Sequence, residues 1–111
     1  MTFRPACTVS EIDPGSAISV DLGLDVETAI VRTLDDQVFA IWNECSHGMY
    51  ALSEGEIDGC TLECFAHGSR FDLRTGTPLE LPATRPVPVY PVRIDGDTVL
   101  VDIDNPINQE N

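Results

Sequence analysis

Cys45-Ser46-His47 and, further along the chain, Cys64-Phe65-Ala66-His67 each place one cysteine close to one histidine. Sixteen residues separate the two stretches, and they contain both histidines of the sequence. Brought together, they would offer two thiolate sulfurs and two imidazole nitrogens to a metal. Thiolates favour zinc, copper(I) or iron–sulfur clusters, and imidazole suits zinc, copper, iron and nickel. The pattern therefore predicts a metal centre with mixed sulfur and nitrogen ligands.

Zinc is one candidate for this centre, because two cysteines and two histidines can hold a structural zinc ion tetrahedrally. Structural zinc sites of that type usually pair like ligands, with two cysteines in one half and two histidines in the other. The mixed halves of this sequence are atypical of such sites. They suit an asymmetric [2Fe–2S] cluster, in which two cysteines bind one iron and two histidines bind the other.

The arrangement C-x-H-x16-C-x-x-H resembles the signature of the Rieske iron–sulfur proteins. A glycine follows each half at once, Gly48 after the first and Gly68 after the second. The similarity runs residue by residue from about Trp42 to Tyr90. The other residues that match the family are Phe71, Asp72, Thr75, Gly76, Pro78, Leu81, Pro82, Ala83 and Pro86.

The resemblance implies a role for each ligand residue. Cys45 and Cys64 would be the thiolate ligands of the inner iron. His47 and His67 would bind the outer iron, which accepts the electron because neutral imidazole makes it easier to reduce than anionic thiolate does. The exposed edges of the histidines would then be the exit for the electron.

The resemblance also implies how the surroundings of the cluster are built. Gly48 and Gly68 would let the backbone pass close to the cluster and donate N–H groups to its sulfurs. The segment from Pro82 to Pro88 would form a third wall beside the two loops. We expect Phe65, with Met49 and Ala66, to form an apolar docking patch at the histidine tip. The carboxylates expected around that patch are Glu44 and Glu63.

Several positions differ from the high-potential Rieske proteins. Those proteins carry a disulfide between the two cluster loops, but Met49 or Tyr50 and Ala66 stand at the matching positions here. Their serine donor to the cluster is matched by Ser69, whereas their tyrosine donor is replaced by Phe71. Ser69 either bonds the cluster or only caps its own turn. Rieske potentials span about −150 to +300 mV, and the two losses with one retained donor predict a value in the low range, near its upper part.

Composition limits the remaining possibilities. A length of 111 residues and 42% hydrophobic content predict a single domain, residues 1–111. The formal net charge of −13, with no lysine, disfavours nucleic acid and anionic membranes as partners. It favours a partner with a basic face, or only keeps the protein in solution. Met1-Thr2-Phe3-Arg4-Pro5 has no features of a signal peptide, so we expect a cytoplasmic protein. We also expect it to be a monomer.

The hydrophobic pattern predicts an all-β protein, and no window has a convincing helical period. The predicted strands are residues 17–20, 27–34, 37–42, 61–63, 70–73, 90–94 and 98–103. Asp95-Gly96-Asp97 predicts a hairpin between the last two. In residues 98–103 the alternation predicts Val99 and Val101 on a buried face and Asp102 on an exposed one. We interpret Cys7 and Cys60 as small core residues without a disulfide.

Together these observations predict a Rieske-like fold. Its base would be an antiparallel β-sandwich, with a small cluster-binding subdomain of about residues 43–86 inserted between strands. Residues 105–111 would form a flexible tail.

The chain resembles most the Rieske-type ferredoxins of bacterial aromatic-ring-hydroxylating dioxygenase systems. The resemblance implies a soluble one-electron carrier that takes electrons from an NAD(P)H-dependent flavoprotein reductase and passes them to a terminal oxygenase. Consistent with a carrier rather than an enzyme, the sequence has no catalytic dyad, activated nucleophile or phosphate loop. Two alternatives stay open: a ferredoxin associated with iron–sulfur cluster assembly, and an electron-transfer small subunit of a larger oxidoreductase.

Overall fold

The computed structural model describes residues 3–24, 26–44, 51–65, 68–79 and 85–107. Within these ranges every regular element is a β-strand or a single turn of 3-10 helix. In chain order they are β1 (Arg4–Thr8), η1 (Val9–Glu11), β2 (Ser16–Val20), β3 (Thr28–Arg32), β4 (Val38–Trp42), η2 (Leu52–Glu54), β5 (Glu56–Asp58), β6 (Thr61–Glu63), β7 (Arg70–Asp72), β8 (Val89–Tyr90), β9 (Val92–Asp95) and β10 (Thr98–Val101).

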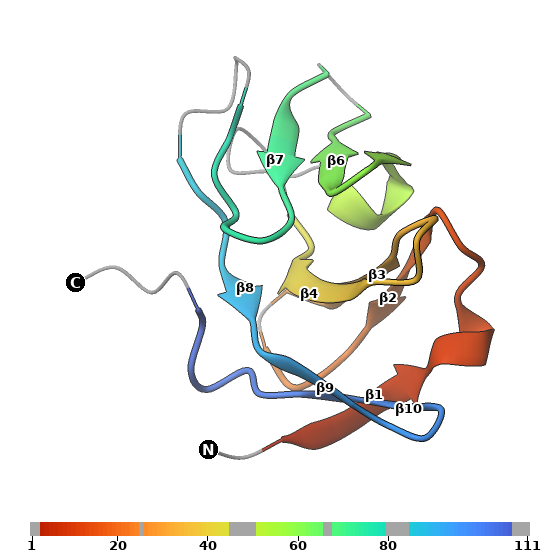
Figure 1. Ribbon diagram of the computed structural model, residues 1–111. Helices are drawn as coiled ribbons and strands as arrows, with labels where there is room; N and C mark the ends of the chain where they lie inside the picture. The colour runs from red at the N-terminus through yellow and green to blue at the C-terminus, as the bar shows by residue number, and fades with distance from the viewer. Residues whose placement is uncertain (1–2, 25, 45–50, 66–67, 80–84, 108–111) are drawn as a thin grey trace.

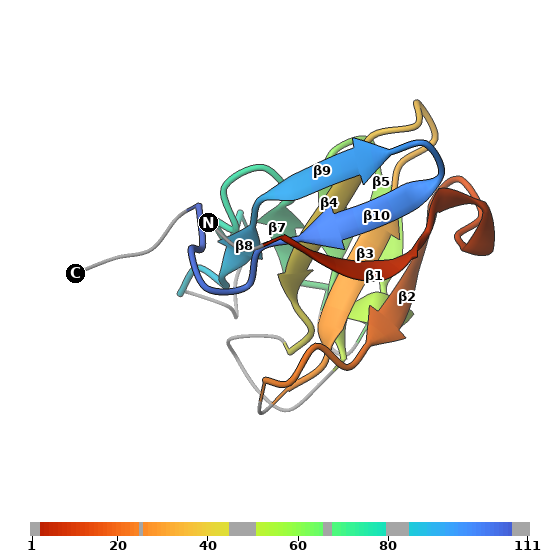
Figure 2. The ribbon, with the colours of Figure 1, turned by 90° about the horizontal axis from the view of Figure 1, so that it is seen from below.

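The strands form three antiparallel sheets. The first has the order β1-β10-β9, the second β2-β3-β4-β8, and the third β5-β6-β7. Figure 2 shows the first sheet in front of the second, with β5 of the third behind it. The predicted all-β, antiparallel fold is therefore confirmed, and the first and second sheets form its sandwich base.

The second sheet, which is the middle one of the three, is covered on both faces. Ile30 and Ala40 point toward the first sheet and pack in one core with Val99 and Val101. Their neighbours along the strands, such as Val31, point the other way into a second core with the small third sheet. Because both faces of the sheet are buried, β3 has no solvent-exposed face, and its sequence is apolar without interruption from Ala29 to Val31. The middle sheet thus fastens the third sheet to the base.

The predicted strands are all present, with ends shifted by one or two residues, and β6 has its predicted bounds. The predicted strand 90–94 is divided at Pro91 into β8 and β9. The predicted hairpin joins β9 to β10, with Gly96 at a φ of 64°. The sequence analysis missed β1, which contains Pro5 and a bulge, and β5, which is short and acidic. Both are strands at the edge of their sheets, where proline and charge are tolerated.

The prediction for Asp102 was wrong, because its side chain is fully buried. Its carboxylate accepts the Asp104 N–H at 3.1 Å and the Asn105 side-chain amide at 3.0 Å, which compensates the burial. Further along, the Ile107 N–H donates to the carbonyl oxygen of Val89 at 2.7 Å. The segment predicted as a flexible tail therefore begins with residues that hydrogen bonds hold against the base.

The two cysteines outside the motif have different surroundings. Cys7 is partly buried against the core, as predicted, and burial together with Glu11 and Asp97 raises the pKa of its thiol to about 11. Cys60 is not a core residue: its sulfur accepts a hydrogen bond from Arg74 Nη2 at 3.2 Å. Neither forms a disulfide. In the described part of the chain, no helix is long and apolar enough to cross a membrane.

Candidate metal centre

The second half of the motif lies on the hairpin between β6 and β7. Cys64 follows β6 directly, and its side chain is buried with 1% exposed. Its N–H donates to the carbonyl oxygen of Ser69 at 2.7 Å, which continues the pairing of the two strands into the loop. The hairpin therefore brings both ends of the loop 64–69 together. Figure 1 shows this end of β6 and β7 on the side of the molecule away from β9 and β10.

Gly68 turns the chain back within this loop. Its φ of 76° lies in the left-handed region, which glycine adopts without a steric cost. Its N–H donates to the carbonyl oxygen of Cys64 at 3.0 Å, and the bond to a cluster sulfur that the resemblance implied stays a prediction. In this structure the glycine shapes the loop that carries Cys64.

The first half of the motif follows β4, which ends at Trp42 as predicted. The described chain continues to Glu44 and resumes at Ala51, just before η2. The side-chain oxygen of Asn43 accepts the N–H of Ser53 at 2.7 Å and thereby joins the two ends of this loop. Sequence reasoning missed Asn43, because nothing in the local pattern indicates which residue an asparagine will bond.

A second missed residue, Gly55, sets how closely η2 approaches β6. A Cβ atom on Gly55 would lie 1.9 Å from the carbonyl oxygen of Glu63, the residue before Cys64. Only glycine allows so close an approach of two backbones. The segment that ends the first loop therefore packs against the strand that begins the second.

The described end of the proline-rich segment lies between the base and the small sheet. The Val87 N–H donates to the carbonyl oxygen of Gly76 at 2.9 Å, and the Trp42 N–H donates to that of Pro88 at 2.9 Å. The end of this segment is thus held beside β4 and beside the turn after β7. Pro82, also predicted for this wall, lies outside the described residues.

Of the four predicted ligands, the structure places Cys64. Cys45, His47 and His67 lie outside the described residues, and so does Gly48. The residues that flank these stretches are described. Asn43 and Glu44 precede the first loop, and Cys64 and Phe65 begin the second.

A comparison with known proteins decides the family. Residues 2–91 match the model of the Rieske [2Fe–2S] domain. The chain belongs to the Rieske family. The predicted Rieske-like fold is thereby confirmed, and the cofactor of this Rieske domain is one [2Fe–2S] cluster rather than zinc.

Relatives of this Rieske domain include components of dioxygenases. The chain is 42% identical over 103 residues to the biphenyl dioxygenase ferredoxin subunit of Pseudomonas sp. (strain KKS102), covering 92% of this chain and 93% of the relative. Among solved structures it is similar to the ferredoxin of carbazole 1,9a-dioxygenase from Nocardioides aromaticivorans IC177, with a TM-score of 0.83 and 37% identity, covering 91% and 97% of the chains. It is also similar to a chain in a complex of reduced oxygenase and oxidized ferredoxin in carbazole 1,9a-dioxygenase, with a TM-score of 0.81 and 33% identity, covering 89% and 91%.

The described residues of this Rieske domain fit a cluster. Cys64 is a buried cysteine without a disulfide, at the mouth of a tight hairpin loop. Thiolate sulfur is the donor that iron–sulfur clusters require. Ser69 is also fully buried beside it, and Phe71 lies in the apolar core opposite Leu62. Phe71 therefore supplies packing where high-potential relatives have a tyrosine hydroxyl.

The predicted docking patch of this Rieske domain is described in part. Phe65 is 54% exposed, as predicted, whereas Met49 and Ala66 lie outside the described residues. Leu79, which the sequence analysis missed, is 52% exposed. Its N–H donates to the Arg70 carbonyl oxygen at 2.7 Å, so it lies beside the same hairpin.

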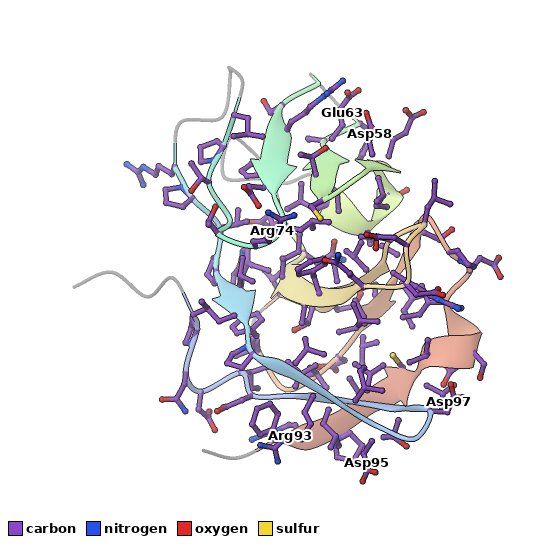
Figure 3. All side chains as sticks on the ribbon, in the orientation of Figure 1. Asp58, Glu63, Arg74, Arg93, Asp95 and Asp97 are labelled. Atoms are coloured by element: carbon purple, nitrogen blue, oxygen red, sulfur yellow. The ribbon has the colours of Figure 1, made fainter. Side chains whose placement is uncertain are left out.

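The predicted carboxylates around this patch differ from each other. Glu63 forms an ion pair with Arg70, with 3.3 Å between Oε1 and Nε, so part of its charge is neutralised. Figure 3 shows Glu63 at the end of the molecule opposite Asp95 and Asp97. Glu44 is half-buried. Of the two predicted carboxylates, Glu63 is therefore paired with a cation and Glu44 is partly covered.

Proposed function

We propose that this Rieske protein is the ferredoxin component of an aromatic-ring dioxygenase system. It takes single electrons from an NAD(P)H-dependent flavoprotein reductase and passes them to a terminal oxygenase. One observation carries the proposal: 42% identity to the biphenyl dioxygenase ferredoxin subunit over nearly the whole of both chains. A second relative has been solved in complex with its oxygenase, which supports a direct encounter with that partner.

The proposed ligands are Cys45 and Cys64 for one iron and His47 and His67 for the other. The buried position of Cys64 supports its assignment, because exclusion of water protects a thiolate ligand from exchange. When bound, the cluster would supply one-electron transfer, and His47 and His67 would hold the iron that gains the electron. The hairpin backbone holds Cys64, and the exposed ring of Phe65 offers an apolar contact to a partner.

We propose an electron carrier that is not itself an enzyme and that acts as a cytoplasmic monomer. The net charge of −13 supports the monomer, because copies of an acidic protein repel one another. Each relative described above that carries a functional name is a ferredoxin of a dioxygenase system. A role in cluster assembly, or as a subunit of a different oxidoreductase, is therefore not favoured.

The test is electron transfer between purified components. The protein is mixed with NADH and the reductase of a biphenyl dioxygenase system, and its reduction is followed by stopped-flow absorbance. We expect reduction at a rate that falls as salt is added, because about 0.15 M salt screens charges separated by more than about 8 Å. Subsequent addition of the oxygenase should reoxidise the protein. No reduction by any dioxygenase reductase would contradict the proposed function, and a rate independent of salt would contradict electrostatic steering.

A further inference from the structure

Asn43 connects three separate parts of the protein just before the first cluster loop. It lies two residues before Cys45, and its side chain is buried with 6% exposed. Its Nδ2 donates to Ser19 Oγ in β2 at 3.0 Å, and its Oδ1 accepts the Ser53 N–H at 2.7 Å. Its own N–H donates to the carbonyl oxygen of Glu27 at 3.1 Å.

The neighbours of Asn43 fix which way its amide points. The Ser19 hydroxyl donates to Glu27 Oε1, so its oxygen is left to accept from Asn43. The amide nitrogen must then face Ser19, and the amide oxygen must face the N–H of Ser53. A reversed amide would place two donors together at Ser53. An aspartate would place two acceptors together at Ser19, so the site is specific for asparagine.

We infer that Asn43 is a positioning residue for the ligands of the first cluster loop. It holds both ends of residues 44–52 at a fixed separation and ties them to β2 of the base. The far end of the same segment packs against the backbone of Glu63, next to Cys64, through Gly55. Asn43 and Gly55 therefore fix where the described ends of the first loop lie relative to Cys64. This inference rests on the proposed assignment of Cys45 and His47 as ligands.

The test compares cluster-loaded wild-type protein with Asn43→Ala and with the control Val99→Ala. Val99 is fully buried in the core between the first and second sheets, so its truncation lowers stability without changing a residue of either loop. The readouts are the EPR line shape of the reduced protein, the half-life of the cluster in chelator and amide exchange at Ser53. For Asn43→Ala, which removes both side-chain hydrogen bonds of Asn43, we expect broadened EPR lines. We also expect amide exchange at Ser53 and loss of the cluster to be at least about tenfold faster, since one buried hydrogen bond alone contributes up to about that factor. For Val99→Ala we expect an unchanged line shape.

A milder variant keeps the proposal testable if Asn43→Ala does not fold. Ser19→Ala retains Asn43 and removes the group that orients its amide, so we expect the same changes with smaller size. Wild-type line shape and cluster half-life in the variant that folds would overturn the positioning role and leave the proposed function intact. A wild-type protein without an iron–sulfur signal would instead refute the proposed function.

Discussion

The two cluster loops are closed in different ways. The second loop is closed by backbone hydrogen bonds, since the Cys64 N–H donates to the carbonyl oxygen of Ser69 and the Gly68 N–H donates to that of Cys64. The first loop begins after β4 and ends at η2, which do not pair with each other as strands. A side chain, that of Asn43, bridges its ends. A backbone closure survives most substitutions, whereas a side-chain closure depends on one residue.

The largest effect is expected where the two loops meet. Gly55→Ala would force a Cβ into the carbonyl oxygen of Glu63, although the φ of −83° suits any residue. Overpacking costs about 1–3 kcal/mol, occasionally more, and we expect the upper end because the obstacle is backbone. Gly59→Ala is the control: its Cβ meets no atom within 4 Å, and its φ of 59° alone costs about 1–2 kcal/mol. Denaturant unfolding should show that Gly55→Ala is the more destabilised variant. The reverse order would contradict the close contact between Gly55 and the backbone of Glu63.

A smaller effect is expected from the turn of the second loop. Gly68→Ala should cost about 1–2 kcal/mol, because an L-residue is strained at a φ of 76° and the added Cβ meets no atom of the described residues within 4 Å. Gly68→Asn should cost less, since asparagine tolerates the left-handed region. Unfolding free energies of the two variants check this. Equal losses would mean that the conformation of Gly68 does not limit the loop.

A third comparison concerns two buried threonines of the base. Thr28, which pairs with Trp42 at the root of the first loop, has no hydrogen-bond partner for its hydroxyl among the described residues. Thr33 Oγ1 bonds Asp35 and accepts the Gln37 N–H at 3.0 Å. Thr28→Val should therefore stabilise the protein, and Thr33→Val should destabilise it by about 1–2 kcal/mol. Thermal unfolding that shifts both variants in one direction would contradict the assigned hydrogen bonds.

The smallest effect separates the two interpretations of Ser69. If its hydroxyl bonds the cluster, Ser69→Ala should lower the reduction potential by tens of millivolts, where 59 mV corresponds to tenfold for one electron. Protein-film voltammetry measures this directly. An unchanged potential would leave Ser69 as a residue of the turn, and a wild-type value above about +100 mV, high in the Rieske range, would contradict the ferredoxin assignment.

The sequence predicted what depends on local pattern. Alternating apolar residues predicted β10, and Asp95-Gly96-Asp97 predicted its hairpin. The buried Asp102 and the role of Asn43 were missed, because each depends on partners that the fold supplies. Gly55 was missed for the same reason, since only the position of β6 makes a side chain impossible there. Cys64, whose proposed role depends on its own motif, was expected in a loop after a strand, and in the structure it directly follows β6.

The central claim is a cluster held by two cysteines and two histidines, and the sequence makes it directly measurable. The chain has only two histidines, so protein grown with ¹⁵N-histidine carries the label at both proposed ligands and nowhere else. Pulsed electron–nuclear double resonance on the reduced protein then counts nitrogens bound to the cluster. We expect two strongly coupled ¹⁵N nuclei in a protein that contains two irons and two sulfides. An iron–sulfur signal without ¹⁵N coupling, or a colourless protein with one zinc per chain, would contradict it.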